Sequence, residues 1–261
     1  MSRQAPHAAY VLHQWPWSET SVILDLFTRE QGRVAAVAKG AKRPYSQLRS
    51  VLLPFQRIQV TLGRPKADES SDILTLRSAE FMGGTAMLPS NHLFSGFYLN
   101  ELLMKLLARQ DAHADLFDTY GDTLAALAMA MPGDDEAVLR AFELMLLHDT
   151  GVLPELDRAT LTQEPLRPGV GYALRAESGL VAAEGDPDPT LTAVQCLALQ
   201  AAIDARDASA LRRAAAEALA ALKLQLRAML HYHLGSPQLR TRDAMREVRR
   251  LLDVPVERST R

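Results

Sequence analysis

The chain has 261 residues, of which 48% are hydrophobic and 23% are charged, and its formal net charge is -2. These values are ordinary for a globular protein, and the length suits two modest domains. The first ten residues hold no apolar stretch typical of a signal peptide, and no segment has the roughly 18 or more apolar residues that a membrane span needs. We therefore expect a cytoplasmic protein.

The N-terminal part of the sequence, before residue 85, alternates apolar and polar residues with a period near two. This pattern predicts short strands, bounded by turn residues. The expected strands are Ala9–Gln14, Ser21–Thr28, Arg33–Ala38, Phe55–Leu62 and Asp72–Phe81. Five short antiparallel strands suit a small closed barrel, either an OB-fold or an SH3-like barrel, and periodicity does not separate the two.

The pattern changes to a helical period near 3.6 after residue 85, so the fold class is α+β. The expected helices are His92–Arg109, Ala114–Met131, Glu136–Thr150, Pro187–Ala205, Ala208–Leu234 and a short one at Arg242–Leu252. A proline- and glycine-rich insertion, about residues 154–189, should hold a hairpin of Gly171–Arg175 with Leu180–Ala183. We expect domains at 1–82 and 83–250, followed by a tail at 251–261.

The sequence lacks the common catalytic signatures. It has no phosphate loop, no dinucleotide-binding glycine motif, no His-Glu-x-x-His and no nucleophile elbow. His231 and His233 point about 200° apart on a predicted helix and cannot share a metal from one face. Cys196, the single cysteine, has apolar neighbours and should be a buried, inert thiol. We expect no catalytic residue, no cofactor and no metal site, and hence a protein that is not an enzyme.

Positive charge is concentrated between Gln31 and Lys66. This stretch carries eight basic residues and no acidic one: Arg33, Lys39, Lys42, Arg43, Arg49, Arg57, Arg64 and Lys66. The remainder has 21 Lys and Arg against 31 Asp and Glu, a net of -10. Cations on one surface attract polyanions, and nucleic acid is the commonest, although chance clustering in a solvated loop is the alternative.

The loop that follows the third predicted strand is the centre of this basic stretch. We expect DNA contacts from Arg33, Lys39, Lys42, Arg43, Tyr45 and Arg49. Gly40 allows close backbone approach to a ligand, and the cations can contact phosphates. Tyr45 either stacks on a base or is simply exposed. Phe27 and Phe55, on neighbouring strands, are more typical of a barrel core than of base stacking.

Several segments in order along the chain carry a family resemblance. They are Val11–Ser21, Leu24–Thr28, Gly32–Val34, Val37–Ala41, Leu53–Phe55, Leu76–Glu80, Tyr98–Leu103, Arg140–Leu144, Tyr232–Gly235 and Leu239–Arg242. Together they closely resemble the bacterial recombination mediator family RecO, over nearly the whole chain. The resemblance implies an N-terminal OB-fold, a C-terminal helical domain and a role in recombinational DNA repair without enzymatic activity.

The resemblance also implies partners. Proteins of this family bind single- and double-stranded DNA and anneal complementary strands. With RecR, and in some organisms RecF, they help RecA load onto DNA coated by single-strand-binding protein, and they bind that protein's acidic C-terminal tail. Two rival functions stay open: a generic single-stranded-DNA-binding OB protein, and an adaptor whose basic loop binds an acidic partner protein.

The insertion departs from the family pattern. Many members carry a four-cysteine zinc knuckle after a Gly-x-x-x-x-Leu-Asp-Arg run. Here the run Gly151–Arg158 is followed by Ala159, and no cysteine lies between there and Gly185. We therefore predict an insertion that holds no zinc and is stabilised by its own packing.

The predicted helix Glu136–Thr150 has two apolar faces. One face holds Val138, Leu139, Phe142, Met145 and Leu146, and the other holds Arg140, Leu144 and Leu147. An arginine beside apolar side chains is complementary to an acidic, apolar peptide tail. With the family likeness, we assign Arg140, Leu144 and Leu147 to the tail of the single-strand-binding protein. The alternative pairs Arg140 internally, with Glu143 or Glu136.

Overall fold

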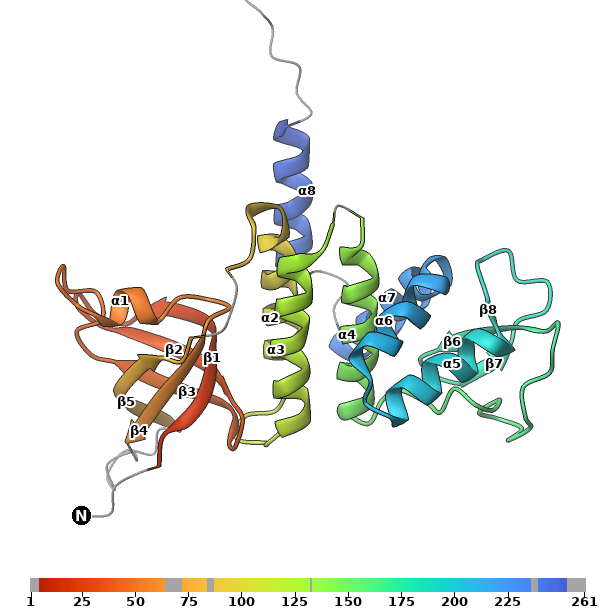
Figure 1. Cartoon of the computed structure of the whole chain (residues 1–261), viewed down its shortest axis with the longest axis horizontal. Helices are drawn as coiled ribbons and strands as arrows, with labels where there is room; N and C mark the ends of the chain where they lie inside the picture. The colour runs from red at the N-terminus through yellow and green to blue at the C-terminus, as the bar shows by residue number, and fades with distance from the viewer. Residues whose placement is uncertain (1–4, 64–71, 84–86, 132, 236–238, 253–261) are drawn as a thin grey trace, which may run out of the picture.

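The computed structural model describes residues 5–63, 72–83, 87–131, 133–235 and 239–252 (Figure 1). Its N-terminal strands are β1 (His7–Pro16), β2 (Val22–Thr28), β3 (Gly32–Ala38), β4 (Arg57–Gly63) and β5 (Ile73–Phe81). They close into a barrel of order β1-β2-β3-β5-β4, in which β3 and β5 pair in parallel and the other neighbours are antiparallel. This closed five-stranded barrel confirms the predicted OB-fold.

Alternation along the strands fills the barrel. Val34, Ala36 and Ala38 of β3 belong to the buried barrel core, together with Leu24 and Leu26 of β2. Small alanines suit the interior of a narrow barrel, where side chains from every strand converge. The side chains of opposite parity therefore face outward, and their surroundings decide where a ligand can reach the barrel.

Helices follow the barrel. They are the single 3-10 turn η1 (Ser90–His92), α2 (Leu93–Leu106), α3 (Ala114–Met129), α4 (Asp135–Asp149), α5 (Ala193–Asp204), α6 (Ala208–Glu217), α7 (Leu219–Leu234) and α8 (Arg240–Leu252). Figure 1 shows α2 and α3 between the barrel and the remaining helices, with α8 projecting from the body. No helix in the described part of the chain is long and apolar enough to cross a membrane.

Two predicted helices differ from those observed. The expected helix Ala208–Leu234 is two helices, α6 and α7, which meet at Ala218, a residue with φ -106° and ψ 13°. The expected helix Pro187–Ala205 begins only at Ala193, because Thr192 and Gln195 form a capping box there. Alanine-rich sequence is helical in either arrangement, so its periodicity does not reveal a break.

The insertion contains a small sheet of order β7-β6-β8. The predicted hairpin is confirmed as β6 (Gly171–Arg175) and β7 (Gly179–Ala182), and β8 (Leu191–Thr192) adds a strand that the sequence did not predict. Leu156, Leu180 and Leu191 are fully buried in the same core as the helices. Apolar packing thus holds the insertion.

Aromatic side chains on the outside of the barrel join the core of the helices, which is separate from the core inside the barrel. Tyr10 of β1 packs on Phe117 and Tyr120 of α3, with ring centroids 5.0 and 4.9 Å apart. Phe27 packs on Phe117 with centroids 5.4 Å apart. Phe27 is therefore buried as expected, but in the junction between the two domains and not inside the barrel.

The hairpin turn between β2 and β3 packs against the segment that precedes α3. Gly32 has a φ of +63°, and a Cβ built on it would lie 1.6 Å from the carbonyl oxygen of Asp111. Both the turn conformation and this close approach therefore require glycine. The contact fixes how the barrel is oriented on the helices, and so which barrel surface stays open.

Candidate nucleic-acid interface

The outer face of β2 and β3 is partly covered by the helical domain. Arg33 of β3 donates to Asp25 of β2 at 2.9 Å, and the two side chains are 14% and 1% exposed. The same guanidinium donates to the carbonyl oxygens of Met104 and Leu107 at the end of α2. Its donors are thus committed within the protein, which corrects the expectation that Arg33 contacts phosphates.

Two loops meet at one end of the barrel. They are residues 17–21 between β1 and β2, and residues 39–56 between β3 and β4, which include the short helix α1 (Leu48–Val51). The backbone N–H of Lys42 donates to the carbonyl of Thr20 at 2.9 Å, and Lys42 Nζ donates to the carbonyl of Ser18 at 2.7 Å. These bonds join the loops into one surface, which we call the barrel-end surface.

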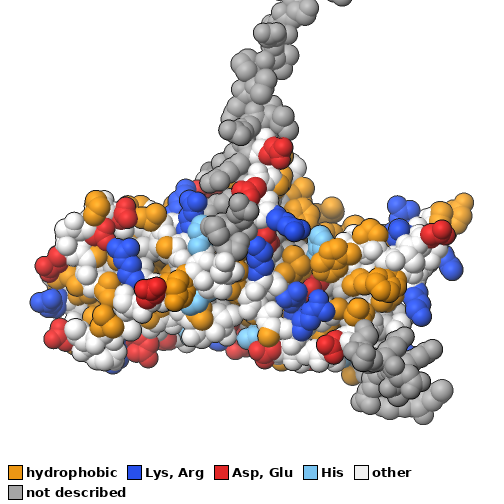
Figure 2. Space-filling view, turned by 180° about the vertical axis from the view of Figure 1, so that it is seen from behind, with side chains coloured by type: hydrophobic (Ala, Val, Ile, Leu, Met, Phe, Trp, Pro, Cys, Tyr) orange, Lys and Arg blue, Asp and Glu red, His pale blue; other side chains and the backbone are white. Residues whose placement is uncertain are grey.

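The remaining predicted DNA-binding residues all lie on the barrel-end surface. Lys39, Lys42, Arg43, Tyr45 and Arg49 are exposed there. Figure 2 shows Lys and Arg side chains at the outer edge of the barrel, away from the helices. Gly40 has a φ of +73°, a conformation that favours glycine, and its carbonyl accepts a hydrogen bond from the N–H of Arg43 at 3.1 Å in the turn that follows Lys39.

The cations of this surface form no ion pair with any residue in the described part of the chain. The side chains of Lys39, Arg43 and Arg49 make no ion pair or hydrogen bond with any residue that the structure describes. By contrast Arg29, at the junction with the helices, pairs with Asp118 at 2.9 Å. Unpaired cations attract phosphate more strongly than paired ones, because no carboxylate must first be displaced.

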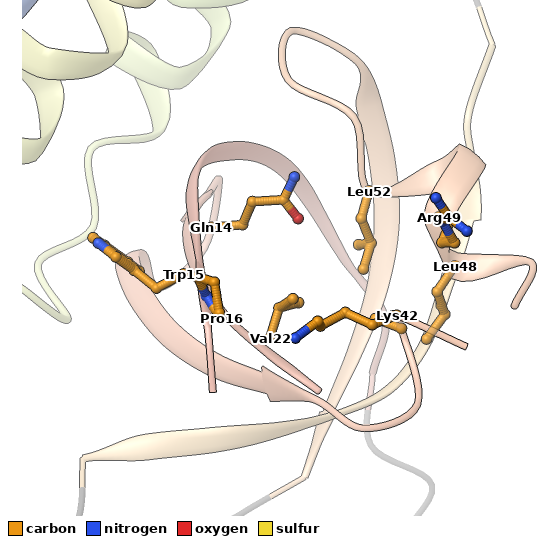
Figure 3. A pocket seen from close by; sticks show the side chains of 9 residues that line it. Gln14, Trp15, Pro16, Val22, Lys42, Leu48, Arg49 and Leu52 are labelled. Carbon is orange, nitrogen blue, oxygen red and sulfur yellow. The ribbon is translucent and has the colours of Figure 1, made fainter. Parts of the chain in front are cut away.

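A cavity opens into the barrel-end surface. It has a volume of about 560 Å³ and is lined by Gln14, Trp15, Pro16, Val22, Ala41, Lys42, Leu48, Arg49 and Leu52. Figure 3 shows the side chains of Gln14, Lys42 and Leu52 around the hollow, whereas the ring of Trp15 points away from it. We call this the barrel-end cavity.

Exposed aromatic rings flank this region. Tyr45 is 99% exposed, Trp17 is 62% exposed and Trp15 is 40% exposed. Trp15 lies opposite Ile23 of β2, on the outward side of the barrel, with the His13 ring 4.5 Å away. The sequence prediction included Tyr45 but missed both tryptophans, although their place at a strand end beside a loop was a usable signal.

The remaining basic residues of the stretch are Arg57, Arg64 and Lys66. Arg57 stacks over the Phe117 ring, 5.6 Å from its centroid, at the contact between barrel and α3. Arg64 and Lys66 lie outside the described residues. Among the described residues of the stretch, four cations belong to the barrel-end surface, and all four come from the β3–β4 loop.

The structure of α4 differs from the partner site that the sequence predicted there. Leu144 and Leu147 are fully buried in the core, so the prediction that they line a surface groove is wrong. Arg140 pairs with Glu143 at 2.7 Å, which is the internal pairing that the sequence left open. Glu143, fully buried, also accepts a hydrogen bond from the Tyr98 hydroxyl at 2.7 Å.

Arg140 nevertheless faces a cavity. The hollow, of about 250 Å³, lies between α2, α4, α7 and α8, and its lining includes Phe94, Tyr98, Leu139, Arg140, Lys223 and Thr241. The Nε atom of Arg140 is buried and has no hydrogen-bond partner among the described residues. Asp135 and Glu136 also line the hollow, and Glu136 pairs with Lys223 there. An unsatisfied buried donor beside apolar side chains suits a ligand that carries an acceptor and an apolar part. We call this the α4 cavity.

Two further predicted features concern reactive groups. Burial raises the pKa of the Cys196 thiol to about 12, so the side chain stays a neutral thiol, as its apolar neighbours predicted. Within the described ranges no three His, Cys, Asp or Glu side chains stand close enough together to hold a metal ion.

Comparisons with known proteins match both halves of the chain. The family Recombination protein O N terminal matches residues 1–83, and Recombination protein O C terminal matches residues 91–243. A DNA repair protein RecO from Polaromonas sp. (strain JS666 / ATCC BAA-500) is 48% identical over 244 residues, 93% of this chain and 96% of the relative.

Two further relatives agree. The DNA repair protein RecO of Acidovorax ebreus (strain TPSY) is 49% identical over 261 residues, which cover 95% of this chain and 98% of the relative. That of Variovorax paradoxus (strain S110) is 47% identical over 259 residues, with the same shares covered. With an OB-fold barrel, a helical domain and matches along nearly its whole length, the chain belongs to the RecO family of DNA repair proteins.

Proposed function

We propose that this protein acts in DNA repair and recombination as a mediator that binds single- and double-stranded DNA through the barrel-end surface. The observation that carries the proposal is the group of cations Lys39, Lys42, Arg43 and Arg49, which no carboxylate neutralises among the described residues. Family membership supports the role in repair. The covered β2–β3 face, which other OB-folds leave to their ligands, supports placing DNA at the loops instead.

The contacts are sequence-independent. Cations in loops reach phosphate oxygens, which are identical in every sequence, and the exposed rings of Trp17 and Tyr45 can stack on any base. A surface of this kind suits a protein that must act on any complementary pair. Annealing follows because neutralising the phosphates of both strands lowers the repulsion between them.

The α4 cavity is the proposed site for the acidic C-terminal tail of single-strand-binding protein. Arg140 and Lys223 would receive its carboxylates, and Phe94 and Leu139 would receive its apolar side chains. Lys223 now pairs with Glu136 at 2.7 Å, an exposed contact that a tail carboxylate can replace. Leu144 and Leu147 support the cavity from within the core and do not touch the tail.

RecR is a further proposed partner, with RecF in some organisms, and RecA loading is the proposed outcome on DNA coated by single-strand-binding protein. This part of the proposal is supported by family membership alone. No catalytic step is assigned to the chain in this scheme, which requires binding and release only.

The test is binding of a fluorescent single-stranded oligonucleotide at low and at high salt, followed by strand annealing in the presence of single-strand-binding protein. We expect binding that weakens steeply with salt, and annealing of coated strands. Binding without annealing would indicate a generic single-stranded-DNA-binding protein. Failure to bind at low salt would overturn the proposal and favour an adaptor that binds an acidic protein.

A further inference from the structure

The barrel-end cavity combines an apolar interior with a polar wall. Val22 and Leu52 are 8% and 3% exposed, and Leu48 is half-buried beside them. Gln14 comes from β1 directly opposite Leu24, a residue of the barrel core, so its side chain lies on the inner side of the strand at the open end of the barrel. Figure 3 shows its amide beside the hollow.

The polar groups of the cavity are available to a ligand. The Gln14 amide makes no hydrogen bond to any residue in the described part of the chain, and it offers both donors and an acceptor. The ammonium group of Lys42 donates one hydrogen bond to the Ser18 carbonyl, at 2.7 Å. Because an ammonium group has three donors, it can still bond a ligand. Arg49 has no ion pair to a described residue.

This set of groups matches a nucleobase and its phosphates. A flat, largely apolar ring with hydrogen-bonding edges suits apolar walls that carry one amide, and phosphates suit two cations at the rim. A volume of about 560 Å³ is within the usual range of small-molecule sites.

We propose that the barrel-end cavity holds one unstacked base of a single strand while Lys42 and Arg49 hold the adjoining phosphates. The inference rests on the proposed DNA-binding function and names the part of the nucleic acid that enters the site. In a duplex each base is paired and stacked, and extruding it costs the free energy of pairing and stacking. The cavity therefore favours single strands, whereas the surrounding cations bind both forms.

The test compares oligothymidylate with a strand of the same length whose residues are abasic, so that the two carry equal phosphate charge. Wild-type protein should bind oligothymidylate about tenfold more tightly, a factor that corresponds to about 1.4 kcal/mol. Gln14→Trp and, independently, Leu48→Trp place an indole in the cavity from β1 and from α1. Each variant should bind oligothymidylate only as tightly as the abasic strand, while its affinity for the abasic strand stays that of the wild type.

The matched control is Gln59→Trp, the same substitution on β4, at a residue that does not line the cavity. It should keep the preference for bases. Equal wild-type affinity for the two strands, or a preference that survives both filling variants, would overturn the cavity assignment while leaving DNA binding intact. Failure of wild-type protein to bind either strand would instead overturn the proposed function.

Discussion

Arg33 and Asp25 form a buried, two-point ion pair, with Arg33 Nε 2.9 Å from one carboxylate oxygen and Nη2 2.9 Å from the other. Arg33 also donates to the carbonyls of Met104 and Leu107, two of the acceptors left unpaired at the end of α2. One side chain therefore completes the pair within the barrel and caps a helix of the second domain. This link explains why a cation of the basic stretch takes no part in the proposed DNA surface.

Removing Arg33 should destabilise the protein strongly. Arg33→Ala leaves the buried Asp25 carboxylate with only the longer contact to Arg109, at 3.9 Å, and we expect a loss of about 3 kcal/mol in the free energy of unfolding. Arg29→Ala, which breaks the half-exposed pair with Asp118, should cost much less, because water and salt screen an exposed pair. Urea unfolding of the two variants checks the difference, and equal losses would contradict the assigned role of Arg33.

Glu101 should make stability depend on acid pH. Burial by itself would raise the pKa of Glu101, but hydrogen bonds from Thr241, from the Arg240 backbone and from Lys105 outweigh it and hold the pKa below 4.5. The carboxyl of Glu101 therefore binds a proton more weakly in the folded state than in the unfolded state. Its contribution to the free energy of unfolding is present above the pKa of the unfolded state, and it is lost as the pH falls through the pKa of the folded state.

The check is urea unfolding of wild type and Glu101→Gln from pH 7 to pH 3. Wild type should be the more stable at pH 7, and the difference should shrink below about pH 4.5, where the unfolded carboxyl also takes up a proton. A difference that stays constant over this range would show that the charge of Glu101 does not anchor the start of α8.

Substitutions at Leu147 and Lys223 should distinguish a core residue from a residue that binds the tail peptide. Leu147→Ala should cost about 2–5 kcal/mol in unfolding free energy while the folded protein keeps its affinity for an acidic tail peptide. Lys223→Ala should weaken that affinity about tenfold with little loss of stability, because a charge-assisted contact is worth about 1.5–3 kcal/mol. Arg227→Ala, on the same helix but outside the α4 cavity, is the control and should leave peptide binding unchanged. Calorimetric titration of the peptide measures the affinity of all three variants, and urea unfolding measures their stability.

Cys196 should resist thiol reagents in the folded protein. Burial raises the pKa of the thiol to about 12, so almost no thiolate exists at pH 8, and the thiolate is the reactive form. Labelling with a chromogenic disulfide should therefore be slow in buffer and fast in denaturant. Rapid labelling of native protein would indicate that the α5 core opens readily.

The barrel could be predicted from the sequence because alternation along Ser21–Thr28 and Arg33–Ala38 reports directly which side chains face inward. Which outward side chains stay exposed depends on the second domain, which periodicity does not reveal. Arg33 on β3 and Lys39 just after β3 are an even number of residues apart, so alternation assigns both to the outer face. Only Arg33 contacts α2. The same reason explains Phe27, whose ring packs on α3.

The α4 site shows a second limit. The wheel of α4 predicted two apolar faces, and both faces are buried, since α4 is a central helix contacted by α3, α6 and α7. A helix that is apolar on most sides is a core helix, and a groove cannot be told from a neighbouring helix by its own sequence. Tyr98, Lys223 and Thr241 complete the cavity from three other helices, so no local pattern could have grouped them.

The central claim, that DNA binds at the barrel-end surface, is tested most directly by the salt dependence of single-strand affinity. If Lys39, Lys42, Arg43 and Arg49 each neutralise one phosphate, the logarithm of affinity should fall with the logarithm of salt at a slope of about -2.8. Replacing Lys39, Lys42 and Arg43 by alanine should reduce the slope to about -0.7, whereas alanine at Arg167, Arg213 and Arg227 of the helical domain should leave it unchanged. Parallel slopes for wild type and the barrel-end variant would contradict the account.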